Sequence, residues 1–197
     1  ERQASILRAS ELISKGVYLR DPMRFDIRGS LVCGNNVELD VNVIIEGDVK
    51  LGDDVTIGPN CILKDTEINS GTKIQANSII EGANIGKFCL IGPYARVRPG
   101  TTLGDHVQIG NYVEIKNSNI GSKSRINHHA IILDSDLEEQ VTIGGNTQTS
   151  NHDGVKIHRT KIGHGAYVGG GCNLVAPLVV NANATIAAGS TITEEVA

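Results

Sequence analysis

Residues 85–110, IGKFCLIGPYARVRPGTTLGDHVQIG, carry an aliphatic side chain at every sixth position. A period of six does not fit the helical period of 3.6 and is a multiple of the strand period of two. The repeat therefore predicts short strands whose leading aliphatic residues point to one side. The spacing continues, with some five-residue steps and one loop, through Leu39, Ile45, Leu51, Ile57, Leu63, Ile68, Ile74, Ile80, Ile85, Ile91, Val97, Leu103, Ile109, Ile115, Ile120, Ile126, Ile132, Leu137, Ile143, Ile162, Val168, Leu174, Val180, Ile186 and Ile192.

A second set of positions follows the same register. The fifth residue of each hexad is small or β-branched, and it falls on the same side of the strand as the leading aliphatic residue. Glycine or asparagine serves the bends, where a positive φ is needed. Three hexads close a triangular coil of about 18 residues, which is the hexapeptide form of the parallel β-helix. The fifth positions are Val49, Val55, Cys61, Ala95, Val107, Val113, Ala130, Ala166, Cys172 and Ala184.

The composition agrees with such a core and limits the function. Aromatic residues make up 3% of the 197 residues and tryptophan is absent, so small aliphatic side chains must fill the interior. The formal net charge of −4 argues against a nucleic-acid or anionic-membrane partner. No run of about 18 apolar residues is present to cross a bilayer. Because no signal peptide is visible and the chain begins at Glu1, we expect a piece of a longer protein. The interior cysteines fit a reducing cytoplasm, which is the expected location.

Two segments depart from the hexads. Residues 2–15 have apolar residues at helical spacing followed by Gly16, which predicts a helix packed off one end of the solenoid. We therefore divide the chain into a helical arm and linker, residues 1–29, and a β-helix domain, residues 30–197. Residues 150–160 interrupt the repeat with a polar loop, and insertions in a solenoid collect on one face, often the binding face.

Histidines and cysteines differ in what their register predicts. The cysteines fall on interior positions, where a thiol acts as a small hydrophobe, so we expect neither disulfides nor a zinc cluster. His106 and His164 are expected on the surface. His128 takes an outward position close to the polar loop and is a candidate site, with a histidine-rich metal site as the competing interpretation. The cysteines are Cys33, Cys61, Cys89 and Cys172.

Six motifs are shared with one family. They are residues 17–22 (VYLRDP), 24–29 (RFDIRG), 42–47 (NVIIEG), 91–100 (IGPYARVRPG), 109–116 (IGNYVEIK) and 174–177 (LVAP). With these motifs the chain resembles the bacterial bifunctional glucosamine-1-phosphate N-acetyltransferase / N-acetylglucosamine-1-phosphate uridyltransferase. The resemblance covers essentially the whole chain but only the C-terminal acetyltransferase half of such an enzyme. It implies a left-handed β-helix, a handedness that the periodicity alone does not provide.

The resemblance also assigns roles to individual residues. It makes His128 the general base that takes a proton from the amine of glucosamine 1-phosphate as this amine attacks acetyl-CoA. An imidazole suits the task because its unperturbed pKa is about 6.5. Arg98 and Lys116 match the cationic residues that hold the sugar phosphate. The acetyl-CoA path is matched by Gly145, Asn151, His152, Gly170 and Ala188.

Several matched positions carry a different residue type. Ile131 stands where the family has a tyrosine that contacts the sugar phosphate, and Thr142 where it has a sugar-binding asparagine. Ile157 replaces a lysine of the loop, and Gly170 replaces a serine on the coenzyme path. Each lost polar contact is worth about 1–3 kcal/mol. We therefore expect weakened or redirected substrate binding.

The predicted function is acetyl transfer from acetyl-CoA to the amine of glucosamine 1-phosphate. The product, N-acetylglucosamine 1-phosphate, would serve UDP-N-acetylglucosamine and peptidoglycan precursor synthesis, and no metal is needed. The expected partners are these small molecules, with no nucleic acid and no membrane, in a homotrimer, since the family builds its site between subunits. Two alternatives stay open: a hexapeptide acyltransferase with a different acceptor, and a diverged or engineered solenoid scaffold with little or no activity.

Overall fold

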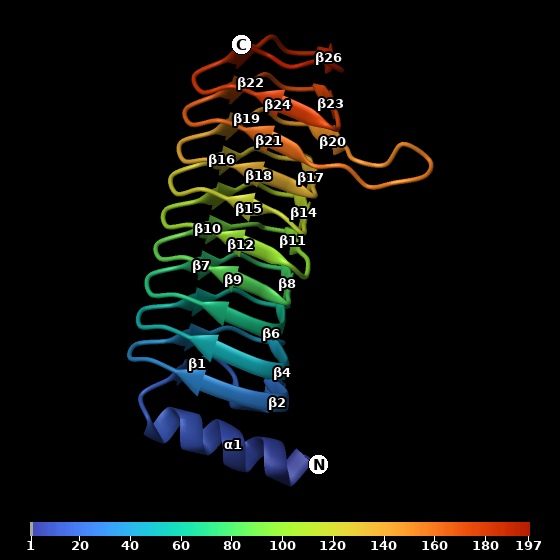
Figure 1. Cartoon of the computed structure of the whole chain (residues 1–197). Coiled ribbons are helices and arrows are strands. Elements are labelled where there is room, and N and C mark those ends of the chain that lie inside the picture. The colour runs from blue at the N-terminus through green and yellow to red at the C-terminus, as the bar shows by residue number, and fades with distance from the viewer. Residues whose placement is uncertain (1) are drawn as a thin grey trace.

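A computed structural model describes residues 2–197, which form one helix followed by a parallel β-helix (Figure 1). The strands pair in parallel with the equivalent strands one coil below and one coil above. In Figure 1 the strands nearest the viewer run from right to left while the chain climbs from the N-terminus to the C-terminus, so the coil is left-handed. The fold class expected from the hexads and from the family resemblance is confirmed.

Each coil has three flat faces. Face 1 contains β1 (Tyr18–Leu19), β3 (Glu38–Leu39), β5 (Thr56–Ile57), β7 (Lys73–Ile74), β10 (Leu90–Ile91), β13 (Gln108–Ile109), β16 (Arg125–Ile126), β19 (Thr142–Ile143), β22 (Tyr167–Val168) and β25 (Thr185–Ile186). Face 2 contains β8 (Ile79–Glu81), β11 (Arg96–Val97), β14 (Glu114–Lys116), β17 (Ile131–Leu133), β20 (Gln148–Ser150), β23 (Asn173–Val175) and β26 (Thr191–Ile192). Face 3 contains β9 (Ala83–Ile85), β12 (Thr101–Leu103), β15 (Asn119–Ile120), β18 (Ser135–Leu137), β21 (Thr160–Ile162) and β24 (Leu178–Val180). In the first coils β2 (Asp26–Cys33), β4 (Ile44–Leu51) and β6 (Ile62–Ile68) run along faces 2 and 3 together.

Stacked aliphatic layers fill the interior, as the repeat predicts. Ile57, Ile91, Ile109 and Ile186 are at most 3% exposed, and the fifth hexad positions are buried as well. Successive coils thus place aliphatic side chains on aliphatic side chains along the axis, at the close packing typical of protein interiors. The predicted register is confirmed.

The cysteines belong to this interior. Cys61, Cys89 and Cys172 are buried, Cys33 is half-buried, and all four are free thiols. Burial raises the pKa of the Cys61 thiol to about 11. A thiol with so high a pKa is a poor nucleophile at neutral pH, so Cys61 acts as a small core residue.

The corners between faces depend on residues with a left-handed backbone conformation. At corner 1–2, between faces 1 and 2, Asn42, Asn60 and Asn77 have φ values of 61°, 59° and 61°. Their amides form a ladder, with Asn42 Nδ2 donating to Asn60 Oδ1 at 2.8 Å and Asn60 Nδ2 to Asn77 Oδ1 at 3.2 Å. Asparagine tolerates this conformation better than most residues, which explains why it recurs at the bends.

The N-terminal helix α1 (Arg2–Ser14) closes the bottom of the solenoid (Figure 1). Ala9 and Leu12 are buried against the first coil, whereas Leu7, counted in the apolar helical pattern, is 71% exposed. The solenoid begins at Tyr18, before the expected boundary at residue 30, because β1 and β2 already pair with β3 and β4. A short 3-10 helix, η1 (Pro22–Arg24), capped by Asp21, joins β1 to β2 and lies outside the hexad pattern.

We predict that two neighbouring valines of β24 differ sharply in their effect on stability. Val180 is 1% exposed and Val179 is 40% exposed. Val180→Ala should lower the free energy of unfolding by about 2 kcal/mol, because it removes buried methyl groups and leaves a cavity. Val179→Ala should cost less than about 0.5 kcal/mol. Chemical denaturation measures both, and equal effects would contradict the assigned register.

Candidate functional site

His128 lies at corner 1–2, between β16 and β17, with an exposed side chain, as its register predicts. Backbone hydrogen bonds align this corner over successive coils: Asn146 N donates to His128 O, Gly171 N to Gly145 O, and Gly189 N to Gly170 O. His128, Gly145, Gly170 and Ala188 therefore form one column along the solenoid axis. The structure brings together four of the residues that the sequence assigns to catalysis and coenzyme binding.

The imidazole of His128 rests on a glycine. A Cβ atom added to Gly145 would lie 2.8 Å from His128 Nε2, so the ring occupies space that any larger residue would fill. His129 presents an edge-on ring with its centroid 5.9 Å from that of His128. His129 itself stacks on Tyr112 at 5.2 Å, and Tyr112 on Tyr94 at 4.9 Å. The exposed aromatic stack lies beside His128.

Above His128 the corner carries almost no side chains. In the three coils above His128, the column consists of Gly145, Gly170 and Ala188. In the upper two of these coils the next residue along the chain is also a glycine, Gly171 after Gly170 and Gly189 after Ala188. A strip of backbone and methyl groups thus leads along the axis to the imidazole. An extended, unbranched ligand could lie on this strip with its end at His128.

Arg98 and Lys116 lie at corner 2–3, at the other edge of face 2. They belong to a column of outward residues in which charges alternate from coil to coil: Arg28 pairs with Glu46, Glu46 with Lys64, and Lys64 with Glu81 in the strand register. The alternation continues from Glu81 to Arg98 and stops at the following coil. Arg98 and Lys116 follow directly on each other, since β11 and β14 align Val97 with Ile115. Two adjacent cations at one edge are an arrangement that could bind an anion.

Each of the two cations has one carboxylate beside it. Arg98 Nη1 donates to Glu114 Oε1 at 2.8 Å, and Lys116 Nζ lies 3.8 Å from Asp134 Oδ2. The Arg98 and Lys116 side chains remain 36% and 29% exposed. Both can therefore meet a ligand from solvent without losing their carboxylate partner.

The polar loop leaves the solenoid at corner 2–3, directly after β20, and projects from it (Figure 1). At its start Asn151 Nδ2 donates to Asp134 Oδ2. At its end Arg159 makes two hydrogen bonds to the Asp136 carboxylate, 2.9 and 2.7 Å long, which lower the pKa of Asp136. Both ends of the loop are thus held on the solenoid.

The loop tip is shaped by a single carboxylate. Asp153 accepts hydrogen bonds from the backbone N–H groups of Val155 and Lys156 and from His158 Nε2, which hold the pKa of Asp153 well below its usual range. His152 and Ile157 face each other across the tip in an antiparallel bridge. Asn151 is half-buried at the loop base and His152 exposed, so of this expected coenzyme-binding pair only the second reaches solvent fully.

The remaining expected site residues lie on two different faces. Ile131 lies on face 2, in the strand between His128 and Asp134, with its side chain 38% exposed. Thr142 lies on face 1, in register with Arg125 and Tyr167. One chain therefore places His128, Ile131, Arg98 and Lys116 around face 2, but it does not bring Thr142 to them.

Asp134 and Glu114 were not singled out from the sequence, although both contact expected site residues. One signal for Asp134 was present: Asn117, Asp134 and Asn151 are spaced 17 residues apart, which is the length of one coil here. Side chains at that spacing stack on each other in this fold. Counting polar residues at the coil length would have found the cluster.

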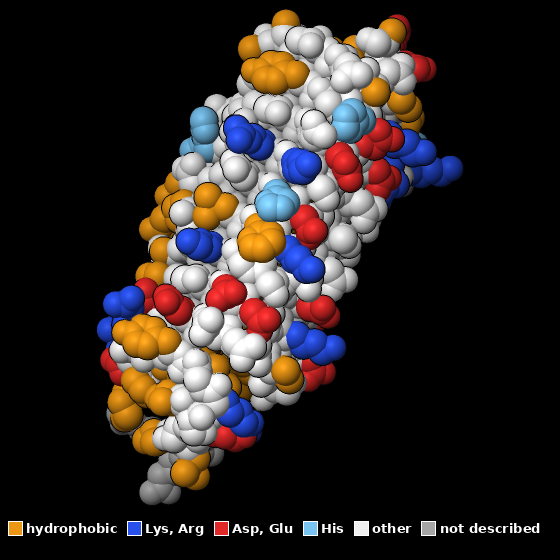
Figure 2. Space-filling model, turned by 90° about the vertical axis from the view of Figure 1, so that its left-hand side faces the viewer, with side chains coloured by type: hydrophobic (Ala, Val, Ile, Leu, Met, Phe, Trp, Pro, Cys, Tyr) orange, Lys and Arg blue, Asp and Glu red, His pale blue; other side chains and the backbone are white. Residues whose placement is uncertain are grey.

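Other kinds of site have little support in the described part of the chain. Residues 2–197 contain no group of three His, Cys, Asp or Glu side chains arranged to hold a metal ion. On the side shown in Figure 2, cationic and anionic side chains are interspersed and form no basic stripe of the kind that binds nucleic acid. No helix among the described residues is long and apolar enough to span a membrane.

Comparisons with known proteins give a match to one family model and matches to curated relatives. The model of the GMPPB C-terminal domain matches residues 27–117. The bifunctional protein GlmU of Nitrosomonas europaea is 49% identical over 187 residues, 95% of this chain and 41% of that protein. GlmU of Methylococcus capsulatus is 51% identical over 196 residues, 99% of this chain and 42% of that protein. The chain thus spans about two fifths of the length of these relatives.

Solved structures support the fold. The UDP-N-acetylglucosamine acyltransferase of Campylobacter jejuni superposes with a TM-score of 0.62, at 19% identity, over 84% of this chain and 68% of that chain. LpxA of Bacteroides fragilis, also a UDP-N-acetylglucosamine acyltransferase, superposes with a TM-score of 0.61, at 16% identity, over 91% of this chain and 66% of that chain.

Proposed function

We propose that this chain, a GlmU C-terminal acetyltransferase-like domain, transfers an acetyl group from acetyl-CoA to the amine of glucosamine 1-phosphate. The product is N-acetylglucosamine 1-phosphate, which serves UDP-N-acetylglucosamine and cell-wall precursor synthesis. The observation that carries this proposal is what lies at the two edges of face 2. Corner 1–2 has an exposed imidazole, and corner 2–3 has two adjacent cations.

The acceptor would lie across face 2. Its phosphate meets Arg98 and Lys116, its ring lies over Ile131, and its amine reaches His128. The neutral amine attacks the thioester carbonyl, a C–N bond forms, and the C–S bond breaks. The proton lost by the nitrogen passes to the imidazole and from there to the departing thiolate. An imidazole does this well at neutral pH because its unperturbed pKa is about 6.5.

The coenzyme would approach along the column above His128. The strip formed by Gly145, Gly170 and Ala188 offers room for an extended pantetheine arm whose thioester ends at the imidazole. Asn151 and His152 would contact the acetyl-CoA from the loop. The smooth strip is the feature of this chain that supports coenzyme binding, because a large side chain there would block the approach.

The changes at the acceptor positions favour a second candidate function within the same chemistry. Ile131 presents an aliphatic surface in the middle of face 2, where a polar contact to the sugar phosphate is expected from the family. An acceptor with a more apolar part would fit this surface better. A thiol-release assay with acetyl-CoA and a panel of amino-sugar phosphates separates the two candidates, since only the first requires glucosamine 1-phosphate to be the best substrate.

We predict that the protein is a homotrimer. Thr142 on face 1 and the projecting loop can meet the acceptor only if a second copy covers face 2 with these elements, and three copies can close such a contact around an axis. Light scattering at micromolar concentration should give three times the 20.9 kDa chain mass. A monomer mass under these conditions would count against both the trimer and a shared site.

We predict that His128→Ala lowers kcat for acetyl transfer about 10²- to 10⁴-fold, the usual contribution of a general base. His129→Ala is the matched control, because His129 is the next residue at the same corner and stacks on Tyr112 instead of facing the reacting amine. Its kcat should stay within about threefold of the wild type. Steady-state thiol release measures both. An unchanged kcat in His128→Ala would end the general-base assignment.

We predict that Arg98→Ala and Lys116→Ala raise KM for glucosamine 1-phosphate about 10- to 100-fold and change kcat little, since phosphate binding is similar in the ground and transition states. Lys64→Ala is the control: Lys64 lies in the same column, three coils below Lys116, and the KM of this variant should be unaffected. With glucosamine lacking the phosphate as acceptor, the KM of each of the three variants should equal that of the wild type. An equal rise for both acceptors would show that the cations do not bind the phosphate.

A further inference from the structure

Asp134 is the most deeply buried carboxylate of the described residues and lies directly beside the candidate site. It is 3% exposed, whereas ionisable side chains are rarely buried without a partner. It follows β17 at corner 2–3 with a φ of 47°, a left-handed conformation that aspartate adopts only occasionally. Both its burial and its backbone conformation therefore need support from the surrounding residues.

Three donors surround the carboxylate, two from the coil below and one from the coil above. Asn117 Nδ2 donates to Asp134 Oδ1 at 2.5 Å, and Asn151 Nδ2 donates to Asp134 Oδ2. Lys116 Nζ lies 3.8 Å from the same Oδ2 atom. The carboxylate therefore connects a cation of the phosphate-binding pair with the first residue of the projecting loop.

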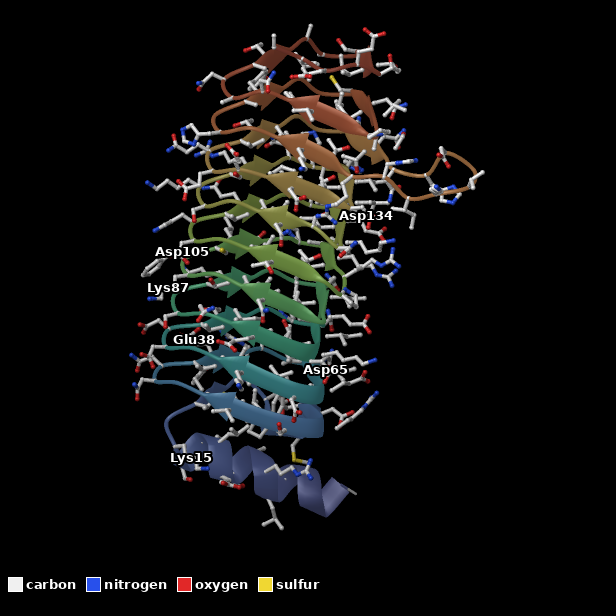
Figure 3. All side chains as sticks on the ribbon, in the orientation of Figure 1. Lys15, Glu38, Asp65, Lys87, Asp105 and Asp134 are labelled. Carbon is white, nitrogen blue, oxygen red and sulfur yellow. The ribbon has the colours of Figure 1, made fainter. Side chains whose placement is uncertain are left out.

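Asp65 shows what the same corner looks like without this cluster. It has a φ of 46° and lies on the same edge of the solenoid, several coils below Asp134 (Figure 3). Its side chain is exposed and accepts one backbone hydrogen bond, from Asp48 N at 3.0 Å. Glycines occupy the corner in other coils, at Gly47, Gly82 and Gly100. The bend itself therefore needs no carboxylate, and the burial of Asp134 reflects the loop and Lys116.

We propose that Asp134 is a positioning residue that holds the base of the loop and the Lys116 ammonium in one fixed arrangement, so that the coenzyme contact at Asn151 and the phosphate contact at Lys116 are ready before either substrate binds. The proposal deepens the proposed acetyl transfer and rests on it. Preorganisation of this kind lowers the cost of binding, because less side-chain and loop freedom is lost when the ligand arrives. Asp134 touches no reacting atom and acts through Asn151 and Lys116.

The test compares Asp134→Gly with Asp65→Gly. Glycine suits the left-handed conformation at both positions, so each variant removes a carboxylate without straining the bend. In Asp134→Gly we expect trypsin to cleave after the exposed Lys156 at least tenfold faster than in the wild type, and the KM for acetyl-CoA and for glucosamine 1-phosphate each to rise about tenfold with kcat within threefold. Asp65→Gly should stay within twofold of the wild type in all of these measurements.

A second variant keeps the test decisive if Asp134→Gly folds poorly. Asp134→Asn preserves the shape and one acceptor oxygen but removes the charge that faces Lys116 and one of the two acceptors. Its loop cleavage rate and both KM values should fall between those of the wild type and Asp134→Gly. A graded rise of both KM values points to the carboxylate itself, because a loss of folded protein lowers the apparent kcat and leaves KM unchanged.

The readouts distinguish a failure of this proposal from a failure of the proposed function. Trypsin cleavage needs no substrate, so it reports on the loop even if the wild type transfers no acetyl group. Wild-type cleavage rates in both Asp134 variants would overturn the proposal whether or not the chain is active. Faster cleavage with unchanged KM values in an active enzyme would overturn the positioning role and leave only a structural one.

Discussion

The structure depends on one constraint: each coil closes around an interior that accepts the leading aliphatic residue of each hexad and the small or β-branched fifth residue. Parallel strands in adjacent coils lie about 4.8 Å apart, so every interior residue stacks on its equivalents above and below. A charged or oversized side chain at one of these positions would disturb its two neighbours as well as its own coil. Small hydroxyl side chains such as Thr72 and Ser124 fit because they donate hydrogen bonds to backbone carbonyls. Residues such as Ile57 and Ile115, with no exposed surface, show how closely this rule is followed.

The same stacking explains where chemistry can arise. Interior positions are reserved for packing and corner backbones for turning, so the outward side chains at the ends of the strands are free to vary. Because residues 17 or 18 apart become direct neighbours, outward residues form columns along the axis. The columns through His128 and through Lys116 are both of this kind, one at each edge of face 2. A solenoid thus builds a site from one residue per coil and not from a loop cluster.

Much of this could be predicted from the sequence because the period is a local property. The hexads identified the interior residues and placed His128 outward, and Cys61 and Cys172 fell inside as expected. The handedness came from the family resemblance, since both hands share one periodicity. Asp134 was missed because nothing local distinguishes it from Asp65: both occupy a tight corner with a left-handed backbone conformation. Its burial results from contacts with Asn117 and Asn151, one coil away on either side.

The charges of the column through Lys116 alternate in the lower coils, and this alternation is broken where Arg98 and Lys116 follow each other. Opposite charges on neighbouring parallel strands attract, so the series from Arg28 to Glu81 stabilises the stack of coils, whereas two successive cations weaken it. The fold tolerates the pair because Glu114 and Asp134 neutralise each cation from outside the column. This lateral neutralisation leaves the cations partly exposed to solvent at the edge of face 2. Functional sites are where a sequence is expected to depart from the pattern that stabilises the rest of the fold, and two successive cations are such a departure. Because this pair lies across face 2 from His128, the two edges can belong to a single candidate site.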